Sequence, residues 1–199
     1  FDAESRYSER SRRPIVNAEM IRTYVDLAGA FSGSKNARCA SKYIQDNSNS
    51  PAETWIAMLS VLPYSNGGYA LPFPELNGEV LLSKEAASFI GRDRLRGDMV
   101  WNERKVVVEY DSNVSHLDPS QHSYDKKRLT ALELSGYKVI SMTAQDFISV
   151  SSLDKAFSMI GKALGIRIRE ERLAKYHRLR QEILLRMKNS SSYVSLNNL

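Results

Sequence analysis

The run Lys105-Val-Val-Val-Glu-Tyr-Asp111 constrains the fold more than any other segment of the chain. Its three valines present apolar side chains to both faces of a strand, which is typical of a strand inside a sheet that is covered on both sides. Because side chains alternate along a strand, Glu109 and Asp111 point to the same face as Val107. A buried carboxylate without a partner is costly. We therefore expect something to compensate this pair, and a divalent cation is the simplest candidate.

A third carboxylate, Asp98, lies on the strand expected over 97–101, which should form a hairpin with Lys105–Asp111 around residues 102–104. A loop of two or four residues places Asp98 opposite or diagonal to Glu109, with Cβ atoms at most about 8 Å apart. A three-residue loop would put them on opposite faces. Two carboxylates at that spacing can share Mg²⁺ or Mn²⁺, which prefers oxygen ligands. Such a centre can orient a phosphodiester and activate water.

The patterns around this hairpin predict an α/β (α+β) fold, with a mixed sheet flanked by helices and helical extensions at the N- and C-terminal sides. A helix start is clear at Ser50-Pro51-Ala52-Glu53, because Ser50 can cap, Pro51 suits the first position and Glu53 can close a capping box. The other expected elements are helices over 18–31, 35–45, 119–135 and 152–188 with an interruption at Gly165, strands over 78–83 and 137–143, a loop over 64–74, and a basic linker containing Arg92, Arg94 and Arg96.

Three regions are expected along the chain. Residues 1–49 would hold a polar arm and two helices, 50–150 the core, and 151–199 a basic helical extension. The first boundary falls near the turn-forming run Asp46–Ser50. Because the chain starts at Phe1, we expect it to be a fragment or a processed piece of a longer chain.

The composition excludes several classes of protein. Apolar residues make up 42% and charged residues 26% of the chain, as in soluble globular proteins. No apolar run approaches the roughly 20 residues that cross a bilayer, and no leader pattern is visible. Cys39 is the only cysteine, which excludes an intrachain disulfide and a cysteine-rich zinc site. We expect a cytoplasmic protein with no membrane partner.

The net charge of +5 is concentrated near the C-terminal side. Residues 166–188 contain eight basic and three acidic side chains, so their excess equals that of the whole chain. Such a patch suits DNA, because neutralising phosphates releases counterions, and Arg172, Lys175 and Arg178 are the candidate contacts. A solvated helix face explains the charges equally well. The Leu/Ile/Met stripe of this segment leaves a third possibility, packing on a second copy as a homodimer.

Several short motifs together resemble a branch of the PD-(D/E)xK restriction-endonuclease-like superfamily that is similar to the very-short-patch repair endonucleases. The similarity covers about residues 50–147, and the order and spacing of its motifs are more specific than any one of them. The motifs are Ser50-Pro51-Ala52-Glu53, Pro74-Glu75-Leu76-Asn77, Gly97-Asp98, Val108-Glu109-Tyr110-Asp111, His116, Tyr124-Asp125-Lys-Lys-Arg128, Leu132 and Gly136-Tyr137-Lys-Val139.

The resemblance implies a restriction-endonuclease-like fold and metal-dependent hydrolysis of DNA. Asp98 and Glu109 would bind Mg²⁺ or Mn²⁺, and His116 would handle protons or phosphate. Asp111 and Glu53 would assist as further carboxylates. A catalytically inactive DNA-binding or regulatory module on the same fold is the alternative.

Two departures from the superfamily pattern bear on activity. The usual lysine, two positions after the acidic residue, is Asp111 here, a substitution that the branch often shares, and the glycine that usually follows is Ser112. A positive charge for the site would then come from Lys126, Lys127 or Arg128, of which Lys126 and Arg128 are also candidate nucleic-acid contacts.

Structural roles remain open for the same residues. Glu53 can serve only to complete the capping box, and His116 can be a polar loop residue. The paired carboxylates can be ion-pair partners of Arg94 or Arg96. Three aromatic residues are expected in the core or at its rim rather than as stacking platforms for bases: Tyr64, Tyr69 and Trp101.

Overall fold

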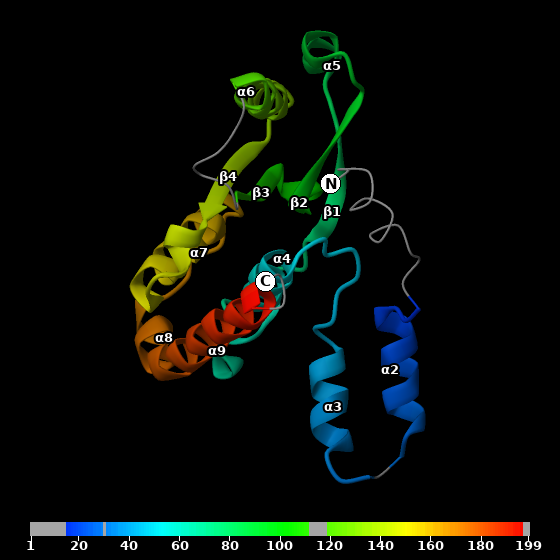
Figure 1. Cartoon of the computed structure of the whole chain (residues 1–199), viewed down its shortest axis with the longest axis vertical. Helices are drawn as coiled ribbons and strands as arrows, with labels where there is room; N and C mark the ends of the chain where they lie inside the picture. Colours follow the sequence, from blue (N-terminus) through cyan, green and yellow to red (C-terminus); the bar gives the residue numbers. More distant parts are fainter. Residues whose placement is uncertain (1–14, 30, 112–118, 197–199) are drawn as a thin grey trace. The chain divides into compact units, whose positions relative to one another are not determined.

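Residues 15–29, 31–111 and 119–196 are described by a computed structural model (Figure 1). The chain forms two compact units, which divide between Asp46 and Asn47. Within the described ranges, no helix is both long enough and apolar enough to cross a membrane.

The first unit contains a pair of helices, α2 (Ala18–Leu27) and α3 (Ser34–Ser41). Asn17 caps α2, since its side chain accepts a hydrogen bond from the backbone of the first turn. The Arg22 guanidinium of α2 donates to the carbonyl oxygens of Ser41 and Ile44, which ties the two helices together. Both helices are shorter than expected: α2 ends before Gly29, which adopts positive φ, and α3 ends at Ser41.

The second unit is built on a four-stranded sheet with the order β1-β2-β3-β4. The pairs β1–β2 and β2–β3 are antiparallel and β3–β4 is parallel, so the sheet is mixed, as predicted. The helix α6 (Pro119–Leu134) provides the crossover between the two parallel strands. The strands are β1 (Glu75–Leu81), β2 (Arg94–Trp101), β3 (Val106–Asp111) and β4 (Lys138–Thr143).

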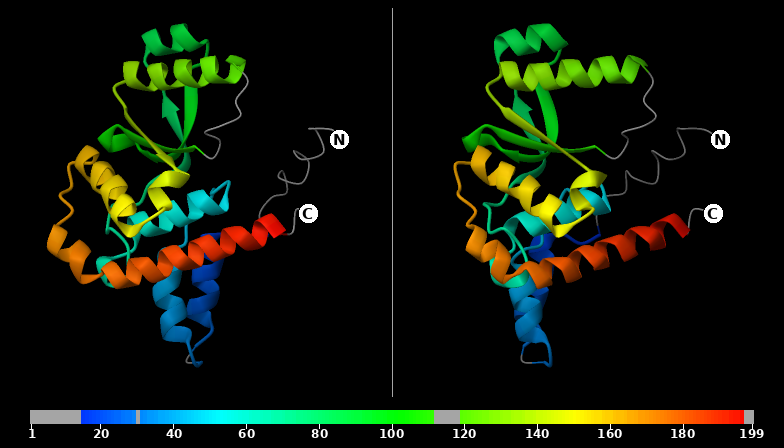
Figure 2. Two further views of the ribbon diagram at one scale, coloured as in Figure 1. Left: turned by 60° about the vertical axis from the view of Figure 1, so that its left-hand side comes forward. Right: turned by 90° about the vertical axis from the view of Figure 1, so that its left-hand side faces the viewer.

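Helices cover both faces of this sheet (Figure 2). The larger apolar core lies against α4 (Pro51–Val61), α7 (Val150–Ala163) and α9 (His177–Leu196), and the smaller one against α5 (Lys84–Ile90) and α6. Val106 and Val108 of β3 belong to the larger core and Val107 to the smaller one. The valine run is therefore buried on both faces, which confirms the interpretation of this segment as a central strand.

The region around the first two strands differs from expectation. The segment expected to be a basic linker is the start of β2, preceded by α5, which was not expected. Arg94 and Arg96 are exposed while Leu95 and Gly97 are buried, so the charged residues occupy the outer face of a true strand. The hairpin loop has four residues rather than three, because Lys105 adopts φ 53° and closes the loop instead of opening β3.

The C-terminal helices pack within the second unit. After Gly165 the chain forms α8 (Glu170–Lys175) and then α9, whose Leu184 and Met187 are buried in the larger core. Arg180 belongs to the basic stretch 166–188 but not to its surface, because its side chain is fully buried. Its Nε lies 2.8 Å from Asp154 Oδ1 of α7, and the Tyr69 hydroxyl donates to the same oxygen at 2.6 Å.

Candidate functional site

The register of β2 and β3 brings the two predicted metal ligands together. Met99 is the last residue of β2 that pairs with β3, opposite Val108, and Asp98 and Glu109 are the residues that follow this pair on the two strands. The four-residue loop is one of the two lengths that place both carboxylates on one face of the sheet. Glu109 faces α6, because Val107, two positions before it on the same strand, packs in the smaller core.

Asp98 occupies the end of the β2–β3 ladder. Its Oδ2 accepts a hydrogen bond from the backbone N–H of Tyr110 at 2.6 Å, beyond the last paired residues. The carboxylate thus replaces a main-chain acceptor where the two strands separate. Burial raises the pKa of Asp98, the Tyr110 N–H opposes that shift, and the nearby Glu53 carboxylate adds to it.

Glu109 is bound to an arginine from α6. Its Oε1 lies 2.8 Å from Nη2 of Arg128, and the two side chains are only 14% and 25% exposed. The same nitrogen of Arg128 also donates to the carbonyl oxygen of Arg96. Burial raises the pKa of Glu109 to about 7, Arg128 opposes this shift and Asp98 adds to it. Arg128 is therefore the member of the three predicted cations that contacts this carboxylate.

Glu53 is held at the start of α4. Its carboxylate accepts hydrogen bonds from the Asn49 N–H at 2.9 Å, the Ser50 hydroxyl at 2.9 Å and the Asn77 amide at 3.1 Å. The expected cap at Ser50 is present, since its oxygen also accepts from the Glu53 N–H at 3.2 Å. Glu53 thus has the structural role, and it lies close enough to Asp98 to influence its pKa.

Asn77 belongs to one of the motifs above but was not predicted as a site residue. It lies on β1 opposite Asp98, between the pairs that flank this position in the register. Its φ of 49° is unusual inside a strand and tolerated best by Asn or Gly. Its amide donates to Glu53 and to the carbonyl oxygen of Asn47. The Asn77-Gly78 dipeptide was the available signal, because this pair favours positive φ.

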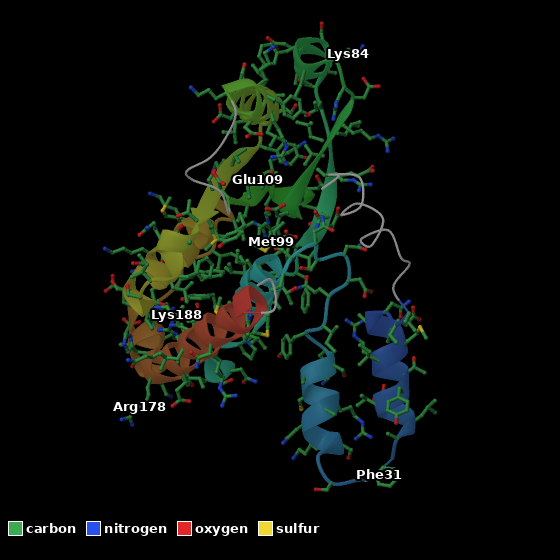
Figure 3. All side chains as sticks on the ribbon, in the orientation of Figure 1. Phe31, Lys84, Met99, Glu109, Arg178 and Lys188 are labelled. Atoms are coloured by element: carbon green, nitrogen blue, oxygen red, sulfur yellow. The ribbon has the colours of Figure 1, made fainter. Side chains whose placement is uncertain are left out.

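None of the other predicted site residues is recorded in contact with Asp98 or Glu109 within the described part of the chain. Asp111 is exposed at the end of β3, opposite Thr143 of β4, and His116 lies outside the described residues. Lys126 is exposed on α6. Arg172, Lys175 and Arg178 are exposed on α8 and α9, and α9 packs against the sheet face opposite to α6 (Figures 2 and 3).

Asp98 and Glu109 are the two carboxylates of this site that could act together as ligands of a divalent cation. The described part of the chain contains no group of three or more His, Cys, Asp or Glu side chains that could hold an ion. Mg²⁺ needs fewer, since it commonly takes one or two carboxylates and completes its shell with waters and substrate phosphates. Each carboxylate has a second oxygen besides the one in the bonds above, and two buried like charges are stabilised by a cation.

Comparison with known proteins adds no assignment. No family model, curated protein or solved structure matches this chain.

Gly97 offers a test of how tightly this centre is packed. A Cβ on Gly97 would lie 2.6 Å from Cγ1 of Val107, 2.9 Å from Cγ2 of Val100 and 3.4 Å from Oε1 of Glu109. We expect Gly97→Ala to lower the free energy of unfolding by about 1–3 kcal/mol, because the buried valines must shift. Urea denaturation measures this change.

Gly91→Ala is the reference for Gly97→Ala. Nothing lies within 4 Å of a Cβ added at Gly91, so the cost of that substitution is the strain of an alanine at φ 74°. A smaller loss of stability for Gly97→Ala than for Gly91→Ala would contradict tight packing around the carboxylate pair.

The raised pKa of Glu109 predicts a pH-dependent stability in the metal-free protein. Its pKa is about 7 in the folded chain against an ordinary value of 4.5, so the protonated form favours folding. This contribution is complete below about pH 4.5 and is lost as the pH rises through about 7. We expect the loss to approach about 3 kcal/mol. Urea denaturation in EDTA across this range should show it for the wild type but not for Glu109→Gln, and parallel profiles would contradict it.

Proposed function

We propose that this chain is a metal-dependent nuclease of the PD-(D/E)xK class that hydrolyses DNA phosphodiester bonds. The observation that carries the proposal is the Asp98–Glu109 pair, two partly buried carboxylates just beyond the end of the β2–β3 ladder, where Asp98 accepts a hydrogen bond from the Tyr110 N–H. The order of the sequence motifs around this pair supports the same class.

The proposed roles follow from the contacts of each side chain. Asp98 and Glu109 would hold Mg²⁺ or Mn²⁺, which when bound would polarise the phosphodiester and lower the pKa of a coordinated water. Arg128 orients Glu109 through its 2.8 Å ion pair and partly offsets the negative charge of the two acids. The hydrogen bond from Tyr110 fixes Asp98. Assisting roles for Asp111, Glu53 and His116 remain predictions.

One observation favours the alternative, an inactive DNA-binding or regulatory module on the nuclease fold. The position of the usual superfamily lysine is Asp111, which is exposed at the end of β3. The cation that contacts the site is instead Arg128. Its guanidinium forms an ion pair with Glu109, one of the two proposed metal ligands. Such a module would bind DNA in a strongly salt-dependent way and would need no divalent ion.

Incubation with supercoiled plasmid and with single-stranded DNA separates the two functions. The nuclease is expected to cut in Mg²⁺ or Mn²⁺ and not in EDTA. DNA binding without cutting in either metal would reject the nuclease in favour of the inactive module.

The C-terminal helices have proposed roles as well. Arg172, Lys175 and Arg178 are exposed and can contact backbone phosphates without reading sequence. A homodimer through α9 also remains a prediction. Leu184 and Met187 are buried within the chain, so a second copy would have to pack on other side chains of this helix, such as the exposed Leu185. Sedimentation of the whole chain tests the dimer, because truncation at Gly165 would remove part of the core.

A further inference from the structure

A basic groove lies between β2 and α6, next to the carboxylate pair. Its cavity is about 400 Å³, and we call it the arginine groove. Among the described residues that line it, four arginines face a single carboxylate, so the lining is strongly positive. These lining residues are Glu79, Arg92, Arg94, Leu95, Arg96, Tyr124 and Arg128.

The arginine groove is continuous with the candidate active site. Arg94 and Arg96 occupy alternate exposed positions of β2, and Leu95 between them packs in the smaller core. Arg128 joins the two regions directly, because its Nη2 donates both to the carbonyl oxygen of Arg96 and to Oε1 of Glu109. The guanidinium of Arg128 therefore lies between the arginine groove and Glu109.

The ion pairs within the groove can be exchanged for a ligand. Glu79 lies 2.9 Å from Arg94 and 3.5 Å from Arg96, and the side chains of Glu79, Arg94 and Arg96 are 50%, 66% and 71% exposed. Exposed ion pairs contribute only about 0–1 kcal/mol. A phosphate can replace Glu79, since a guanidinium binds phosphate through two parallel hydrogen bonds.

An aromatic residue adds a second kind of contact. Tyr124 of α6 is partly exposed, and the guanidinium of Arg92 lies 5.7 Å from the centre of its ring. Surfaces that bind single nucleic-acid strands combine arginines along the backbone with aromatic rings on which bases stack. The arginine groove has both features.

We propose that the arginine groove binds the sugar–phosphate backbone of a DNA strand and leads it to Asp98 and Glu109. Arg94 and Arg96 each contact one phosphate. Their Cα atoms are separated by about 6.6 Å, the rise of two strand residues, which is close to the spacing of successive phosphates on a strand. That the strand is delivered for cleavage rests on the proposed function, whereas its binding in the groove does not.

Binding of a labelled single-stranded DNA in EDTA, followed by fluorescence anisotropy, tests the groove without any cleavage. We expect the double variant Arg94→Ala/Arg96→Ala to bind about tenfold more weakly and to lower the slope of log K against log salt by about 1.4, the value for two lost phosphate contacts on a single strand. The matched control is Lys155→Ala/Lys162→Ala, which removes the same charge from the exposed surface of α7. Glu79→Gln should act in the opposite sense and tighten binding up to about fivefold, because it removes the competing carboxylate.

The results separate the two proposals. If the double arginine variant binds DNA like the lysine control, with an unchanged salt slope, the proposal that the groove binds DNA is wrong. This holds even if the protein cuts DNA. Failure to cut in Mg²⁺ or Mn²⁺, with the arginine and Glu79 effects present, would overturn only the nuclease. Thermal melting checks folding, and the exposed substitutions are expected to change the free energy of unfolding by no more than about 0.5 kcal/mol.

Discussion

Glu109→Gln is expected to reduce Mg²⁺- or Mn²⁺-dependent cleavage of plasmid DNA by about a thousandfold or more. The substitution keeps the shape of the side chain and an oxygen that can accept from Arg128, but it removes the charge that would bind the cation. A metal ion stabilises the transition state by several kcal/mol, and each 1.36 kcal/mol is tenfold in rate. Asp98→Asn should have an effect of the same order, because Asp98 is the other proposed ligand and lies close enough to raise the pKa of Glu109.

The matched control is Glu103→Gln, in the loop that joins the same two strands. Its side chain is exposed, so the variant should cleave within about twofold of the wild type. Glu109→Gln should also remain folded, since it removes a buried charge whose pKa is already raised by burial. Wild-type cleavage rates in a folded Glu109→Gln protein would refute the assignment of the carboxylate pair.

Arg180→Ala is expected to lower the free energy of unfolding by about 3–5 kcal/mol, the cost of breaking a buried ion pair by removing one partner. Asp154 would keep the hydrogen bond from the Tyr69 hydroxyl but lose its cation. The Arg180 side chain is fully buried and its guanidinium lies over the Tyr69 ring at 5.5 Å, so packing is lost as well.

Arg178→Ala provides the comparison for this variant, because it removes the same charge two residues away on the exposed side of α9. Surface changes of this kind are usually within about 0.5 kcal/mol. Urea denaturation of both variants gives the difference. Equal stabilities would mean that the ion pair between Arg180 and Asp154 does not anchor α9 to α7.

The parts of this structure that could be predicted are those set by local patterns. Valines at three successive positions indicate a strand covered on both faces, and Ser50-Pro51 indicates a helix start, whatever the rest of the chain does. The common face of Asp98 and Glu109 followed from alternation once the loop length was restricted to two or four residues. The choice between these lengths depended on Lys105, whose positive φ no simple pattern indicates.

What could not be predicted depends on residues far apart in the sequence. Arg94 and Arg96 suggested a linker because charge dominated the segment, and only the pairing with β1 makes them the outer face of a strand. Arg180 looks like any other arginine of a basic stretch, and its burial is decided by Asp154, 26 positions earlier. Likewise, Asn77 becomes part of the site only through Glu53 on another element.

The two faces of β3 carry different kinds of side chain. On β3, Val106 and Val108 face the larger apolar core, whereas Glu109 faces the opposite layer with Arg128. Substitutions in α7 or α9 can thus repack the larger core without touching Glu109 and Arg128 on the other face of β3. A homologous chain could consequently diverge widely in those two helices and still keep the ion pair between Glu109 and Arg128.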